Sequence, residues 1–248
     1  MIIFICDNKI DGLLSSLFVS FTEKIKPEEV VDRATYQPRF DALIREIKTD
    51  KPSAERVKKA LYKYAGDDVI AHLKVCLSSC NPKALSIAFN YARYILEMRR
   101  DISENLSQKC VSDFSYLVQR VLHERHIVSG FLRFQESSRG VLYAQYAPDN
   151  DITSILAPHF LRRLGHIPFV IHDKKRNKIA VSDGRSIKID YTDLPATFTL
   201  SENESAVNDL WRRYFNAVNI KERKNTRQQD GYFPRRYRHY AFETWECQ

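Results

Sequence analysis

A histidine and a carboxylate stand side by side at the end of one predicted strand, as His172 and Asp173. Water activation or proton transfer requires such a pair, so both are candidate catalytic residues. Neighbouring residues of a strand point to opposite faces, so the two side chains need not touch. Arginines close by in the sequence could hold a phosphate group in bidentate fashion; they are Arg162, Arg163 and Arg176.

A second histidine, His159, is a candidate for the same chemistry. It is in step with Ile152, Ile155 and Leu156 on the apolar face of a predicted helix. A histidine in that position is more often a core residue than a catalytic one. Geometry decides between the two roles, and the sequence leaves both open.

Two further carboxylates, Asp7 and Asp11, flank the end of the first predicted strand and the start of the helix after it. Such a pair could bind a divalent ion, as in many nucleases. A turn for Asp7 and a helix N-cap for Asp11 is the interpretation we favour. We predict no metal site and no cofactor, because the sequence has no GxGxxG, GxxxxGK[ST] or GxSxG pattern and its five cysteines show no CxxC spacing.

The positive charge of the chain is concentrated near its C-terminus. Between Trp211 and Tyr240 there are nine Lys and Arg against two Asp and Glu, whereas the whole chain carries a net charge of +8. A local positive field attracts a polyanion, and aromatic residues within it could stack on unpaired bases. We expect nucleic-acid contacts from Lys221, Arg223, Lys224, Asn225, Arg227, Arg235, Arg236 and Tyr237. The alternative is a solvated surface whose arginines pair with acidic groups of the same fold.

Arg133 is one more candidate for a base or phosphate contact, because it alternates with Phe131 on a predicted strand. The final helix could instead cover it. Just before it, Glu124 and Arg125 are expected to pair with Arg133 or with other neighbours at a helix-to-strand junction. Length and composition are ordinary for a folded protein. The longest apolar run, Met1–Cys6, is too short to span a membrane or to act as a signal peptide, so we expect a cytoplasmic protein.

The predicted elements give an α+β fold with a helix-rich N-terminal half and a small, mostly antiparallel sheet. Met1–Cys6 indicates a buried strand, and residues 52–125 are almost entirely helical in pattern. Residues 130–146 are predicted to form a hairpin, 151–164 a helix interrupted or restarted at Pro158, and 167–191 three strands with a tight turn at Asp183-Gly184.

Ser201 and Glu204 match a capping box for a final helix, which an apolar stripe is expected to anchor. A basic, aromatic tail follows over 220–248. We expect the first strand to join the later sheet. That would make 1–248 a single compact unit with 30–125 as a helical insertion.

Seven short motifs occur in an order that resembles one bacterial family, described only as DNA-metabolism proteins of unestablished activity. They are D-x-x-x-D-G-L-L from Asp7, E-R-H-I-V-S-G-F-L-R-F from Glu124, P-H-F-L-R-R from Pro158, I-H-D-K-K-R from Ile171, L-W-R-R-Y-F from Leu210, I-K-E-R-K-N from Ile220 and P-R-R-Y from Pro234. The family usually has tryptophan after P-R-R-Y, where this chain has Arg238.

The resemblance implies a setting in DNA repair or modification, beside a radical-SAM protein and in some members a uracil-DNA-glycosylase-like domain. We therefore expect a DNA-binding accessory protein that recognises or delivers substrate, with the chemistry in the partner. The competing expectation is a nuclease or base-excision enzyme in which His172 or Asp173 activates water, or Asp7 and Asp11 bind a metal. No membrane partner is expected.

Overall fold

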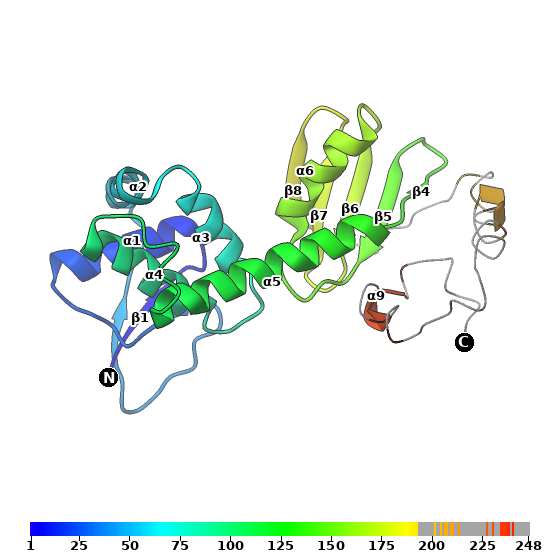
Figure 1. Cartoon of the computed structure of the whole chain (residues 1–248). Helices are drawn as coiled ribbons and strands as arrows, with labels where there is room; N and C mark the ends of the chain where they lie inside the picture. The colour runs from blue at the N-terminus through cyan, green and yellow to red at the C-terminus, as the bar shows by residue number, and fades with distance from the viewer. Residues whose placement is uncertain are drawn as a thin grey trace. The chain divides into compact units, whose positions relative to one another are not determined.

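The computed structural model of the chain describes residues 1–192 and, beyond them, positions 201, 204, 206, 207, 209, 210, 213, 227, 230, 234–238 and 240. The chain forms two compact units, Met1–Leu122 and His123–Gln248. The fold is α+β, as the sequence predicted, with helices dominating the first half and small sheets in both units (Figure 1).

The first unit is built on a parallel sheet in the order β2-β1-β3. The central strand is β1 (Ile2–Cys6), flanked by β2 (Glu29–Asp32) and β3 (Leu43–Glu46). A parallel strand covered on both faces is apolar throughout, and β1 is buried from Ile3 to Cys6. The prediction of a buried first strand is confirmed.

The prediction that this first strand joins the later sheet was wrong. β1 pairs with β2 and β3, and in the described residues the second sheet consists of later strands alone. The helices of the middle region belong to the first unit and are not an insertion into a larger one. They are α2 (Lys51–Ala65), α3 (Val69–Leu77) and α4 (Ala84–Met98). Phe89 of α4 packs edge-on against Phe4, and Ser86 exchanges hydrogen bonds of 2.8 Å with the backbone of Val30.

Helix α1 (Ile10–Thr22) connects β1 to β2. Its start, close to the end of β1, requires the glycine of the first motif, Gly12. A Cβ added at Gly12 would lie 2.4 Å from the carbonyl oxygen of Asp7. Only glycine lets the helix begin this close to the end of the strand.

Helix α5 (Lys109–Phe131) begins in the first unit and ends in the second. The predicted strand at Gly130–Phe134 was wrong, because the helix runs through Phe131 and the Leu132 amide still donates to the Val128 carbonyl at 2.9 Å. The hairpin that follows is shorter than expected, with β4 (Gln135–Glu136) antiparallel to β5 (Leu142–Tyr146).

The second sheet has the order β4-β5-β6-β7-β8. Its later strands are β6 (Phe169–Asp173), β7 (Lys178–Ser182) and β8 (Ile187–Tyr191), which confirms the three predicted strands. All pairs are antiparallel except β5 with β6. Helix α6 (Thr153–Leu164) connects this parallel pair and runs continuously through Pro158, where a break was expected. It covers one face of the sheet, as Figure 1 shows, and buries Ala144, Ile171 and Ala180 there.

Beyond the second sheet, the described positions from 204 to 213 are helical, as are 227 and 230, and α9 (Arg235–Arg238) forms a further helical turn. The predicted capping box has a different partner, since the Glu204 carboxylate accepts the Glu136 amide at 2.9 Å and the Ser201 amide donates to the Glu136 carbonyl. The predicted apolar stripe is not buried where it is described, because Val207 and Leu210 are 53% and 68% exposed. Its other members Trp211, Tyr214, Phe215 and Val218 lie outside the described residues.

The tight turn at Asp183-Gly184 yields a test of the second unit. Gly184 has φ +85°, and a Cβ there would lie 2.2 Å from the His166 carbonyl oxygen. We expect Gly184→Ala to lower the free energy of unfolding by at least about 2 kcal/mol. Gly130 lies in a helix with nothing within 4 Å of an added Cβ. Gly130→Ala should therefore raise it by about 0.5–1 kcal/mol. Urea unfolding of both variants checks this, and equal effects would contradict the packing at Gly184.

Candidate functional site

The two parallel strands β5 and β6 end at the same edge of the second sheet, and the loops that follow them lie together. Ligand sites of α/β sheets commonly form at such an edge. One loop runs from 147 to 152 and leads into α6, and the other runs from 174 to 177 after Asp173. The predicted catalytic pair His172 and Asp173 lies on the second of these strands.

Asp173 is fully buried, and Arg176 joins it to the neighbouring loop. The Arg176 guanidinium contacts the Asp173 Oδ2 at 2.9 Å and also donates to the backbone carbonyls of Pro148, at 3.1 Å, and Asp149. The other carboxylate oxygen accepts the amides of Lys175, at 2.9 Å, and Arg176, at 3.3 Å. Both oxygens of Asp173 are therefore occupied, and Arg176 is a bridge between two loops of the fold.

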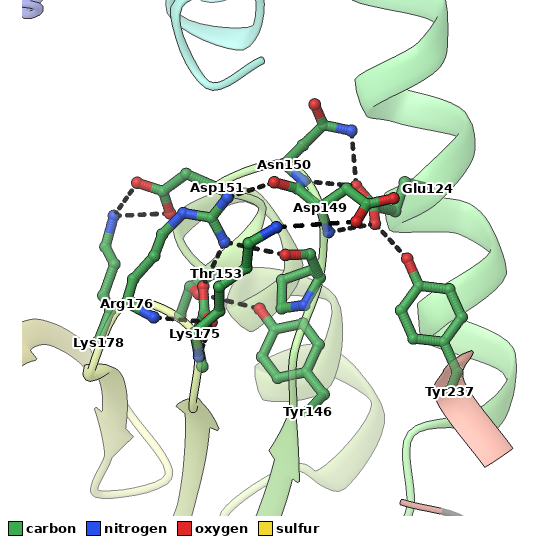
Figure 2. A network of polar contacts seen from close by, with 12 residues as sticks. Glu124, Tyr146, Asp149, Asn150, Asp151, Thr153, Lys175, Arg176, Lys178 and Tyr237 are labelled. Atoms are coloured by element: carbon green, nitrogen blue, oxygen red, sulfur yellow. Dashed lines mark hydrogen bonds and ion pairs between the residues drawn. The ribbon is translucent and has the colours of Figure 1, made fainter. Parts of the chain in front are cut away.

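Other cations at this edge are also paired. Lys178 is buried and contacts both oxygens of Asp151, at 2.9 and 2.7 Å. The Lys175 ammonium lies 3.8 Å from the Asp149 carboxylate. Figure 2 shows how these contacts continue from Lys178 and Arg176 to Glu124. The edge is thus a network that neutralises its own charges.

Glu124 on α5 completes the network. Its carboxylate is 6% exposed and accepts the amides of Asp149, at 2.8 Å, and Asn150, at 2.9 Å. The Asn150 side chain donates to it at 2.6 Å, and the hydroxyl of Tyr237 donates as well. Glu124 therefore pairs with a loop and with the C-terminal turn, whereas Arg133 or other neighbours at the end of the helix were the expected partners.

Tyr237, expected to stack on a base, is 1% exposed. Its ring lies 5.1 Å from that of Phe131, measured between centroids. Stacking on a nucleic acid would require the ring to leave this position. Burial raises the pKa of the Tyr240 hydroxyl, and the negative charge of Asp173 raises it further.

His172 faces away from Asp173, on the opposite side of the sheet. The Tyr143 hydroxyl lies 2.8 Å from its Nδ1. Burial lowers the pKa of His172, the positive charge of Lys174 lowers it further, and Asp173 acts in the opposite direction. The proposed catalytic pair is thus divided between two faces, which does not favour water activation by these residues.

A second group of cations surrounds His159 of α6 in the second unit. His159, Arg162 and Arg163 lie three and four residues apart on α6, so they share one side of the helix. Burial lowers the pKa of His159, and the positive charges of Arg163, Arg125 and Arg162 lower it further. The Nε of Arg125 and the Nε2 of His159 are buried without a hydrogen-bond partner among the described residues. We call Arg125, His159, Arg162 and Arg163 the arginine cluster.

The described tail arginines differ from this cluster. Arg235 and Arg238 both contact Asp230, at 3.0 and 2.6 Å. Arg227 is exposed. Arg133 is half-buried at the end of α5 and donates to the Gly130 carbonyl at 3.4 Å. The remaining tail candidates Lys221, Arg223, Lys224 and Asn225, and the side chain of Arg236, lie outside the described residues.

The two carboxylates of the alternative metal pair, Asp7 and Asp11, make different contacts. The predicted N-cap at Asp11 was wrong, because Lys9 occupies the N-cap position of α1. Asp7 accepts the Thr49 hydroxyl at 3.0 Å and lies 3.5 Å from the Arg33 guanidinium, whereas Asp11 occupies the first turn of α1 without capping it. Among the described residues no group of three His, Cys, Asp or Glu side chains is arranged to hold a metal ion. Over the same residues, no helix has the length and apolar character of a membrane span.

Sequence reasoning missed the roles of Glu124 and Arg125. Both belong to the second motif, but the residues that define their roles lie far along the chain. Tyr237 is 113 residues from Glu124, and the charge of Arg125 acts on His159. Helical or strand periodicity relates neighbours only, so it carries no signal for these contacts. The family motifs are a better signal, since Glu124 and Tyr237 each belong to one.

The hydrogen bond from Tyr237 to Glu124 can be tested by a substitution that removes only the tyrosine hydroxyl. Tyr237→Phe takes one donor from a buried carboxylate, and we expect the free energy of unfolding to fall by about 1.5–3 kcal/mol. Tyr191→Phe is the control, because Tyr191 is 67% exposed and should change stability by less than about 0.5 kcal/mol. Urea unfolding measures both, and a neutral Tyr237→Phe would refute the contact.

The bridging role of Arg176 can be tested against its neighbour. Arg176→Ala leaves the buried Asp173 charge unpaired, and we expect a loss of about 3–5 kcal/mol in the free energy of unfolding. Lys175→Ala removes an exposed pair of the same loop and should cost less than about 1 kcal/mol. If thermal unfolding showed similar losses for the two variants, Arg176 would not be the bridge described above.

Comparison with known proteins places these residues in a family. No curated protein matches the chain. A family model described as a domain of unknown function, DUF4130, matches residues 82–243. The match begins just before α4 and includes Glu124, the arginine cluster and Tyr237. Since it spans more than half of the sequence, the chain belongs to the DUF4130 family.

Proposed function

We propose that this protein binds DNA as an accessory factor in DNA repair or modification, with the arginine cluster as a principal contact to the phosphate backbone. The observation that carries the proposal is a contrast among the cations of the second unit. Arg176, Lys178, Arg235 and Arg238 each contact a carboxylate. Arg125, Arg162 and Arg163 contact none among the described residues, although they lie around one histidine.

Unneutralised guanidinium groups on one surface are suited to a phosphate chain. Arg162 and Arg163 are exposed on the last turn of α6, where they can reach backbone oxygens and donate in bidentate fashion. Such contacts position a protein on nucleic acid and supply affinity by releasing counterions. The C-terminal end of a helix also favours cations. That effect accounts for Arg162 and Arg163 individually, but not for Arg125 in the middle of another helix.

The basic tail is expected to contribute to DNA binding as well, but less than the arginine cluster. Arg235 and Arg238 face a single Asp230, so this turn keeps a net positive charge despite the ion pairs. Exposed Arg227 adds to it. The tail turn is bonded to Glu124 through Tyr237 within the same unit. A nucleic acid bound at the cluster would therefore meet further positive charge.

DNA as the polyanion, and a radical-SAM protein as the partner that performs the chemistry, rest on the resemblance of the seven motifs. A uracil-DNA-glycosylase-like protein is a second partner that the resemblance implies. The division of labour is supported by the site itself, because His172 is buried against Tyr143 and Asp173 is held by Arg176. The arrangement favours recognition of a substrate over its chemical conversion.

Fluorescence anisotropy with single-stranded and duplex DNA over a salt series tests this function. We expect Arg162→Ala/Arg163→Ala to weaken binding about tenfold or more at low salt, and to reduce the slope of log K against log salt by about 1–2. Lys174→Ala/Lys175→Ala, which removes two exposed cations from the loop after β6, is the matched control and should have little effect. Absence of DNA binding by the native protein at low salt, or equal losses in the two variants, would refute the proposal.

A further inference from the structure

Two buried nitrogen atoms of the arginine cluster require an explanation that backbone binding alone does not give. The Arg125 Nε and the His159 Nε2 are buried and make no hydrogen bond within the described residues. A buried polar group without a partner costs about 1–3 kcal/mol. Two such groups on neighbouring helices, surrounded by positive charge, are suited to an anion that enters from the surface.

The charges on each helix show which ligand this surface can take. Arg162 and Arg163 follow His159 by three and four residues on α6, and Arg125 of α5 is close enough for its charge to act on the His159 ring. None of the three has a carboxylate partner among the described residues. An internal phosphodiester carries a single negative charge, whereas a terminal phosphomonoester carries about −1.5 to −2 at neutral pH. The more highly charged group better matches three guanidiniums.

The burial of the two nitrogen atoms also favours a terminal phosphate over an internal one. An internal phosphate has a sugar on each side, so both strand directions must remain outside the protein while the phosphate enters. A terminal phosphate presents three unsubstituted oxygens and has one covalent neighbour, so it can enter between two side chains. Exposed Arg162 and Arg163 remain available to the next phosphates along the strand.

We infer that Arg125 and His159 form a socket for the terminal phosphate of a DNA strand. This inference rests on the proposed function and specifies its substrate as a DNA end or nick. In the socket the guanidinium of Arg125 donates from Nε, and His159 donates from Nε2 to a second phosphate oxygen. Arg162 and Arg163 hold the adjoining backbone.

The test compares one oligonucleotide sequence in four forms: 5′-phosphorylated, 3′-phosphorylated, with hydroxyl ends, and ligated into a circle. The circle keeps every internal phosphate and has no end. With the native full-length protein, we expect one phosphorylated form to bind about tenfold or more tightly than the hydroxyl-ended form and the circle. Which of the two phosphorylated forms binds more tightly identifies the strand end.

Two substitutions, one on α5 and one on α6, test whether Arg125 and His159 cause the preference for a phosphorylated end. Arg125→Lys keeps the charge but lacks the Nε donor and the planar fork, and His159→Gln keeps the size without a titrating ring. Each should abolish the preference for the phosphorylated end, measured as the ratio of the affinities of one variant for the phosphorylated form and for the circle. Because the substitutions are independent, misfolding of one variant leaves the other informative, and thermal unfolding identifies it.

The outcomes separate the two levels of the proposal. Equal binding of all four forms by the native protein would overturn the socket and leave DNA binding intact. A preference for phosphorylated ends that persists in both variants would overturn its assignment to Arg125 and His159. If none of the four forms bound, both the socket and the proposed function would be refuted.

Discussion

The second unit depends on the solvation of one buried carboxylate. A charged group removed from water must be surrounded by donors, and Glu124 receives two backbone amides, one side-chain amide and one hydroxyl. Three of these donors belong to the loop that leads from β5 into α6, and the fourth ties the C-terminal turn to α5. Glu124 therefore sets where α6 starts relative to α5, and so brings His159 and its arginines toward Arg125.

The described cations of the second unit fall into two groups, those that contact a carboxylate and those that do not. The edge formed by β5 and β6 has a high density of charged residues, but Lys175, Arg176 and Lys178 each contact a carboxylate, and these pairs stabilise the fold. The arginine cluster has fewer cations and no acidic partner among the described residues. A count of charges along the sequence gives most weight to the tail, yet Arg235 and Arg238 of the tail share Asp230. Pairing, and not abundance, identifies the surface that can bind an anion.

The sequence predicted those elements that a few consecutive residues determine. The apolar run at Met1–Cys6 gave a buried strand, and Asp183-Gly184 gave a tight turn. β2 and β3 were missed because each has only four residues, and β3 is exposed throughout, so neither shows an alternating pattern. The single-unit prediction failed with them, since without these strands β1 had no nearby partner. Arg162 and Arg163 were predicted from their residue type, whereas Arg125 could be added only once α5 was placed beside α6.

The contact between Glu124 and Tyr237 has a further consequence for the order in which the second unit assembles. It closes a loop of 113 residues, whereas the β5–α6–β6 connection and the β6–β7 pairing join segments that are near in the sequence. Loop-closure entropy grows with loop length, so local pairings form at lower cost and the Tyr237 contact follows them. A contact that forms last on a finished surface can also open without the sheet beneath it. We therefore expect the backbone amides of α9 to exchange with solvent earlier than those of β6, through an opening far smaller than global unfolding.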